Sequence, residues 1–278
     1  MLWKNRRSSG NIVDRRSMGA GSLGIGGLVI GAIIYFLSGG NPADYLAQNA
    51  INIQQESSTT SAIENDGQKT FVGVVLADTE DVWNAIFKER GETYQEPKLV
   101  LFKNAVESSC GRASSAVGPF YCPADKQVYL DLSFFDELSQ SLGAKGDFAS
   151  AYVIAHEVGH HVQNLLGIEQ AFRARQARVN ATERNRLSVL VELQADCLAG
   201  IWAKHTQQTK NVLEAGDIEE ALGAASAVGD DKLQKAARGE VVPDSFTHGS
   251  SEQRMRAFQT GFGEGNLDSC LAMTQSMI

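Results

Sequence analysis

The sequence contains fewer basic than acidic residues, and it has few histidines and cysteines. Its 278 residues include only five histidines and four cysteines, and 25 lysines and arginines against 33 acidic residues leave a net charge of −8. Such an acidic chain is a poor binder of nucleic acid. The chain also lacks a Walker A motif, a dinucleotide-binding glycine motif and a serine nucleophile elbow. These absences exclude nucleic-acid binding, nucleotide chemistry and serine-hydrolase chemistry as its main function.

Two of the histidines stand four positions apart in the stretch AYVIAHEVGHHVQNLLG, residues 151–167. At about 3.6 residues per turn, His156 and His160 fall on one face of a helix, where both imidazoles can bind one Zn²⁺. Glu157 lies beside them, and its carboxylate can take a proton from the attacking water. His161 points away from this face and is expected to pack or to hydrogen-bond behind the site. The motif predicts a hydrolytic zinc site.

A catalytic zinc ion usually has three protein ligands, so the motif requires one more. His205 and His248 are candidates, but Glu192 in SVLVELQADCLAG is the better one, because it would complete a set of two histidines and a glutamate. Asp196 lies four residues on, where it would accept the outward N–H of one zinc-binding histidine. The alternative is a solvated acidic helix face, which the apolar neighbours disfavour.

The motifs HEVGH and ELQAD resemble those of the glutamate zincins, in which a glutamate completes the HExxH site and has an aspartate four residues on. From about residue 70 to 260 the chain resembles the bacterial neutral zinc metallopeptidase family, through FYCPADKQVYLDLSFF, AHEVGHHVQ, ELQADCLAG and FTHGSSEQRMRAF. The resemblance implies an α+β, zincin-like fold that is mostly helical, with a small antiparallel sheet or hairpin before the active-site helix. It also implies Zn²⁺ bound by His156, His160 and Glu192, with Glu157 as the base of a metalloendopeptidase.

Further candidates for the site lie elsewhere in the chain. His248 is a candidate for stabilising the oxyanion formed during hydrolysis, and Arg254 for pairing with Asp196; the alternative for both is an ordinary surface position. Three tyrosines are also available as oxyanion donors: Tyr121, Tyr129 and Tyr152.

A β-hairpin is predicted just before the zinc-binding helix, with strands around residues 115–122 and 127–132 joined by a Pro-Ala-Asp-Lys turn. In zincins an edge strand at this place binds the peptide substrate. Gln127–Asp131 is therefore either that substrate-binding edge or an ordinary interior strand. Further upstream, Asp78 or Thr79 is expected to cap a helix through VWNAIFKERG.

The first quarter of the chain predicts a membrane anchor. Residues 1–17 form a basic tail, residues 18–39 an apolar transmembrane helix, residues 40–69 a flexible polar linker, and residues 70–278 the metallopeptidase domain. By the positive-inside rule, this single-pass protein would keep its tail in the bacterial cytoplasm and its domain in the periplasm, outside the inner membrane. The alternative is a cleaved signal peptide, of the twin-arginine type.

The four cysteines are compatible with two disulfides in an exported domain. Cys110 and Cys122 flank the first hairpin strand, which leaves Cys197 for Cys270. Four cysteines permit three connectivities, so this pairing is a hypothesis.

Together these features predict a membrane-anchored zinc metallopeptidase that acts on a peptide or protein. Two other functions stay open. One is a zinc hydrolase of a cell-wall crosslink or another amide, and the other is a membrane-tethered binding protein with a structural zinc. Glu157 argues against the second, because a structural site has no use for a base. Neither the substrate nor the oligomeric state follows from the sequence.

Overall fold

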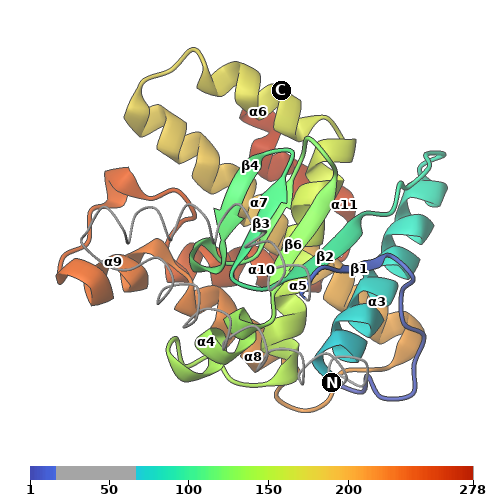
Figure 1. Ribbon diagram of the computed structural model, residues 1–278. Coiled ribbons are helices and arrows are strands. Elements are labelled where there is room, and N and C mark those ends of the chain that lie inside the picture. Colours follow the sequence, from blue (N-terminus) through green and yellow to red (C-terminus); the bar gives the residue numbers. More distant parts are fainter. Residues whose placement is uncertain (17–66, 278) are drawn as a thin grey trace, which may run out of the picture.

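The computed structural model describes residues 1–16 and 67–277, which are mostly helical with two small sheets (Figure 1). The helices are α3 (Gly67–Glu89), α4 (Ser133–Gln140), α5 (Asp147–Leu165), α6 (Ile168–Gln176), α7 (Ala181–Lys210), α8 (Asp217–Ala227), α9 (Asp230–Arg238), α10 (Ser251–Glu264) and α11 (Leu267–Leu271). The strands are β1 (Ile12–Asp14), β2 (Lys98–Phe102), β3 (Ala105–Ser108), β4 (Gly111–Ser114), β5 (Phe120–Cys122) and β6 (Gln127–Asp131). Short 3₁₀ segments are η2 (Ser115–Val117), η3 (Pro243–Ser245) and η4 (Ala272–Met277).

The larger sheet has the strand order β1-β2-β6-β5, and β3 and β4 form a separate antiparallel pair. β1, β2 and β6 run parallel, and only β5 is antiparallel to its neighbour, so the sheet is mixed rather than antiparallel as predicted. After the exposed Lys98, the sequence LVLF of β2 is a continuous apolar run, as expected for a strand whose last four residues are buried. The predicted hairpin is confirmed as β5 and β6, but Gln127–Asp131 is the interior strand and Phe120–Cys122 is the edge.

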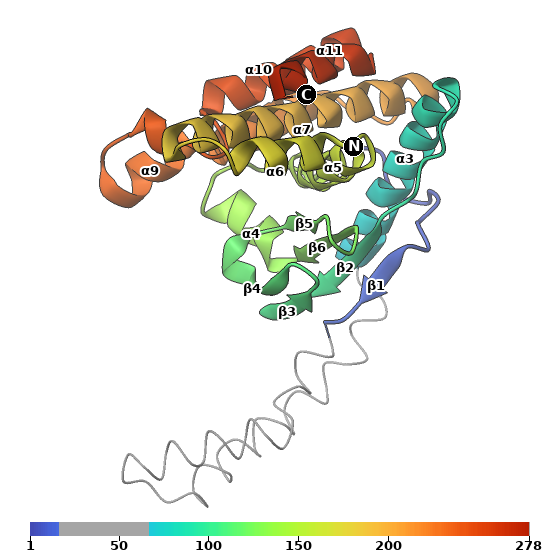
Figure 2. The same ribbon diagram turned by 90° about the horizontal axis from the view of Figure 1, so that it is seen from above.

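The helices lie on one side of this sheet in successive layers (Figure 2). α5 packs on β5 and β6, α7 packs on α5, and α10 packs on α7. Two glycines permit close helix contacts. A Cβ on Gly159 of α5 would lie 2.9 Å from the carbonyl oxygen of Ala195 in α7, and one on Gly261 of α10 would lie 1.8 Å from that of Cys197. The glycine inside HEVGH therefore lets α7 approach the helix that carries both histidines.

Residues 1–16, which we call the N-terminal strap, lie against α3 (Figure 1). Both terminal nitrogens of Arg6 donate to the carboxylate of Asp78, at 2.8 and 2.5 Å, and Arg7 donates to Glu80 at 2.9 Å. Asp78 and Glu80 are 1% and 2% exposed. The strap then continues as β1, which pairs with β2. Its positive charges thus neutralise buried carboxylates of the domain.

This arrangement corrects the predicted membrane topology. A single span between the strap and α3 would put them on opposite sides of a bilayer, whereas they are joined by hydrogen bonds and by a shared sheet. Among the described residues, no helix has the length and apolarity needed to cross a membrane. The predicted span, residues 18–39, lies outside the described residues, as does most of the predicted linker. A cytoplasmic tail joined by one transmembrane helix to a periplasmic domain is therefore wrong.

The helix predicted to begin at Asp78 or Thr79 is part of α3, which begins at Gly67, at least eleven residues earlier. Asp78 is in the middle of α3, where it accepts from Arg6 and from Lys210 instead of capping backbone N–H groups. An acidic residue before an apolar stretch can be a helix N-cap or, as here, an ion-pair partner within a longer helix, and the sequence pattern is the same in both cases. Only the distant residues that it contacts distinguish the two roles.

The structure contains both disulfides in the proposed pairing. Cys110, in the turn between β3 and β4, is joined to Cys122 at the end of β5. Cys197 of α7 is joined to Cys270 of α11. The first bridge holds the edge strand of the sheet, and the second holds α11 against the helix that carries Glu192 and Asp196.

Candidate metal centre

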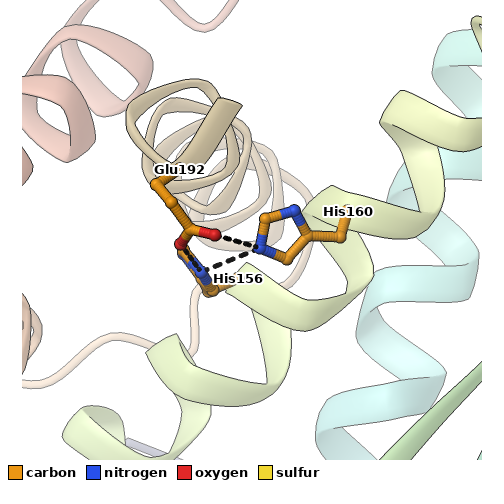
Figure 3. A group of neighbouring side chains, drawn as sticks. All are labelled: His156, His160 and Glu192. Atoms are coloured by element: carbon orange, nitrogen blue, oxygen red, sulfur yellow. Dashed lines mark hydrogen bonds and ion pairs between the residues drawn. The ribbon is translucent and has the colours of Figure 1, made fainter. Parts of the chain in front are cut away.

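Three side chains from α5 and α7 converge at one point (Figure 3). His156 Nε2 lies 3.2 Å from His160 Nε2 and 3.2 Å from one carboxylate oxygen of Glu192, and His160 Nε2 lies 3.5 Å from the other. One potential ligand atom from each of the three lies within 4.8 Å of the others. The helical spacing of the two histidines and the close contact of α7 at Gly159 produce this convergence.

The outward nitrogen of His156 is held by a buried network. His156 Nδ1 lies 2.7 Å from Oδ1 of Asp196, which is 0% exposed. Arg254 donates to both oxygens of this carboxylate, from Nε at 2.8 Å and from Nη2 at 2.9 Å. The hydroxyl of Tyr152 also donates to Asp196 Oδ1. Asp196 therefore keeps its charge and fixes the ring of His156, and Arg254 lies where the sequence suggested.

The electrostatics of the cluster favour a cation. Burial lowers the pKa of His156, but the charge of Asp196 and hydrogen bonds to Asp196 and Glu192 raise it overall to about 10. Burial raises the pKa of Glu192, but the charge of His160 and hydrogen bonds from both histidines hold it well below its usual range. The buried carboxylates of Glu192 and Asp196 therefore favour positive charge at this point. A divalent cation can supply that charge.

The outward nitrogen of His160 has a different partner, which the sequence reading missed. His160 Nδ1 lies 2.8 Å from Oε1 of Gln163, and the amide nitrogen of Gln163 donates to Val191 O and to Gln194 Oε1, at 2.7 and 2.9 Å. Gln194 in turn donates to Cys270 O and to Thr274. Gln163 is three residues after His160 and therefore on the same helix face, and this spacing could have predicted their contact.

A cleft of about 610 Å³ opens over the cluster and includes Glu157, His156 and His248 in its lining. Within the described part of the chain, the Glu157 carboxylate makes no hydrogen bond to protein, unlike those of Glu192 and Asp196. His248 is half exposed, and its ring bonds to Asp230, which raises its pKa. The same carboxylate accepts the backbone N–H groups of residues 247–249. Asp230, another residue that sequence reading missed, thus holds the loop that carries His248.

Two other histidines and the three candidate tyrosines have partners that keep them from acting as ligands or oxyanion donors here. His205 bonds to the carbonyl of Gly265, far along α7. The hydroxyl of Tyr129 donates to Asp125, and that of Tyr152 to Asp196. Tyr121 bonds to His161, which is fully buried and whose pKa burial lowers to about 4. His161 is therefore neutral and lies behind the cluster.

The comparisons with known proteins identify a family for this chain. A family model described as "Putative neutral zinc metallopeptidase" matches residues 1–273. The chain belongs to this family. Its relatives include Uncharacterized protein YpfJ of Escherichia coli K12, which is 47% identical over 290 residues and all of both chains. Uncharacterized protein Rv2575 of Mycobacterium tuberculosis is 42% identical over 210 residues, which cover 72% of this chain and 70% of the relative. No solved structure matches the chain.

Proposed function

We propose that this family member is a zinc-dependent peptidase that hydrolyses peptide bonds with Glu157 as the base. The observation that carries this proposal is the convergence of His156, His160 and Glu192 in a cleft that also presents a carboxylate free of protein hydrogen bonds. A structural zinc site needs no such carboxylate.

The donor set fits zinc. Two imidazole nitrogens and one carboxylate are the three protein ligands of one class of catalytic zinc site. Zinc-binding histidines usually donate their other N–H to an oxygen acceptor, and here Asp196 and Gln163 supply those acceptors. His156, His160 and Glu192 would therefore hold the ion without rearranging the two helices.

Each residue of the chain then has a distinct task. Bound zinc would supply a Lewis acid that polarises the scissile carbonyl and lowers the pKa of water. Glu157 takes the proton of the attacking water and delivers it to the leaving amine. His248, which also lines the cleft and whose pKa is raised by Asp230, donates to the oxyanion. Arg254 and Asp196 keep His156 in one orientation.

The cleft supports a peptide as the substrate. β5 is the edge of the sheet, and Phe120 and Tyr121 of this strand line the cleft. An extended peptide can add to such an edge through main-chain hydrogen bonds. Exposed apolar side chains stand on both sides of the cleft, Val117 next to β5 and Leu233 on α9. Of the two alternatives for Gln127–Asp131, the interior strand is the one observed, so Phe120–Cys122 is the candidate substrate-binding edge.

Removal and return of zinc tests the function. The full chain, stripped with a chelator, is expected to lose cleavage of an unfolded protein and of a mixed peptide library, and to recover it with one equivalent of zinc. Zinc binding without cleavage of any peptide would favour the hydrolase of a different amide or the binding protein with a structural zinc. Failure to bind zinc would reject the ligand set itself.

Gln163→Leu is expected to raise the dissociation constant for zinc about 10- to 100-fold, because the N–H of His160 loses the acceptor that orients the ring. Competition with a chromophoric chelator measures this change. Gln208→Leu, at an exposed position of α7, is the matched control and should bind zinc like the unaltered protein. Equal zinc affinity in both variants would show that Gln163 does not support His160.

A further inference from the structure

Side chains of α5, the helix that carries the candidate metal-binding histidines, form hydrogen bonds to β5. The hydroxyl of Tyr121, in the middle of β5, lies 3.0 Å from His161 Nδ1, and Asn164 donates to the same hydroxyl at 2.9 Å. His161 Nε2 faces the backbone carbonyl of Gln95 at 2.5 Å. Because a carbonyl only accepts, Nε2 carries the ring proton and Nδ1 accepts from Tyr121.

This tautomer satisfies every group in the chain of hydrogen bonds. Asn164 donates to Tyr121, Tyr121 donates to His161, and His161 donates to Gln95. The rings also pack: His161 makes edge-to-face contacts with Tyr121 and Tyr94, at centroid distances of 5.4 and 5.7 Å. The hydroxyl proton of Tyr121 is committed to His161, so Tyr121 acts by its position and not as an oxyanion donor.

The geometry of α5 links this contact to the metal centre. His161 follows His160 by one residue, so its side chain leaves the helix about 100° round from that of His160. One face of α5 therefore holds the metal-binding nitrogens, and the adjacent face holds the edge strand. The other fixed point of β5 is the disulfide from Cys122 to Cys110. The separation between edge strand and metal centre is set within one rigid helix.

We propose that His161 and Asn164 are positioning residues that hold Tyr121, and with it β5, where an extended peptide paired with this edge brings its scissile carbonyl to the metal centre. This inference rests on the proposed function and specifies its substrate as an extended main chain. It assigns a function to His161, which follows His160 in the sequence but is not one of the three side chains that converge at the metal centre.

The test compares Tyr121→Phe with Tyr129→Phe in the full, zinc-loaded chain. Each change removes one hydroxyl group, from β5 and from the neighbouring strand β6. The hydroxyl of Tyr129 donates to Asp125, whereas that of Tyr121 contacts side chains of α5. Tyr121→Phe is expected to raise KM for a long peptide about tenfold with little change in kcat. Tyr129→Phe should leave both values unchanged. Zinc content should be the same in all three proteins.

Two hydroxamates separate positioning from general damage to the site. Acetohydroxamate needs only the metal, whereas a peptidyl hydroxamate also pairs with the edge. Tyr121→Phe should weaken the peptidyl compound about tenfold and leave acetohydroxamate unchanged. Equal weakening of both compounds, a fall in kcat at constant KM, or no change at all would overturn the proposal. His161→Leu should weaken the peptidyl compound to the same extent as Tyr121→Phe. His161→Gln, which keeps a donor and an acceptor, should restore part of the lost affinity. If His161→Leu does not fold, the result for Tyr121→Phe decides the test.

Hydrogen exchange distinguishes failure of this inference from failure of the proposed function. The amides of Phe120–Cys122 should exchange about tenfold faster in Tyr121→Phe than in the unaltered protein or Tyr129→Phe. If the unaltered protein cleaves no peptide, the proposed function is wrong, and these rates still decide whether α5 holds β5. Equal exchange in all three proteins would overturn the positioning role.

Discussion

Glu157→Gln is expected to lower kcat for peptide hydrolysis about 10²- to 10⁴-fold while the protein still binds one zinc ion. Glutamine has nearly the same shape as glutamate but cannot take a proton from the attacking water. The ligand atoms of His156, His160 and Glu192 do not include Glu157, so zinc binding is expected to persist. Steady-state kinetics on one peptide, with zinc content measured on the same sample, give the result.

Two further variants make this prediction specific. Glu169→Gln changes another carboxylate that lines the cleft, one already paired with Arg173, and should retain activity. Glu192→Gln removes the charge of a ligand and should lose zinc along with activity. If Glu157→Gln cleaved as fast as the unaltered protein, Glu157 would not be the base. Loss of zinc from Glu157→Gln would instead indicate that this carboxylate supports the metal centre.

Arg6→Met is expected to lower the free energy of unfolding by about 3 kcal/mol, because it leaves Asp78 buried with only part of its charge compensated. Both nitrogens of the Arg6 fork bind Asp78, which is 1% exposed. Lys210 also contacts Asp78, at 2.7 Å, and keeps the loss from being larger. Chemical denaturation, followed by circular dichroism, measures the change.

Arg256→Met is the matched control for the strap. Arg256 pairs with Glu252 on the surface of α10, where both side chains are about three-quarters exposed, and such pairs contribute roughly 0–1 kcal/mol. A change in Arg6→Met no larger than in Arg256→Met would mean that the strap does not stabilise the domain. Intact zinc binding in Arg6→Met would separate this effect from damage to the metal centre.

Local sequence patterns anticipated much of the metal centre. The spacing of four residues places His156 and His160 on one helix face, and the same spacing places Glu192 and Asp196 on another. The capping box of Ser250 and Gln253 at the start of α10 is a pattern of the same local kind. These features depend on helix periodicity and on backbone hydrogen bonding within a few residues, which is why they can be read without a fold.

Signals that depend on distant partners were misread or missed. The basic residues at the start of the chain were interpreted as a topology signal, because their charge could be counted but their partners, buried in α3, could not be located. Likewise, the alternation of the hairpin strands predicted both of them, but it could not distinguish the interior strand from the edge, since β1 and β2 also join the sheet.

The sequence by itself therefore determined the chemistry of the candidate site: which donors are present, how they are spaced on their helices, and that a carboxylate accompanies them. Only the tertiary structure decided which groups meet. It brought Gln163 to His160, Asp230 to the loop of His248, His161 to Tyr121, and the strap to α3. The physical reason is that periodicity acts over one or two turns, whereas buried polar groups find their partners wherever packing brings a donor and an acceptor together.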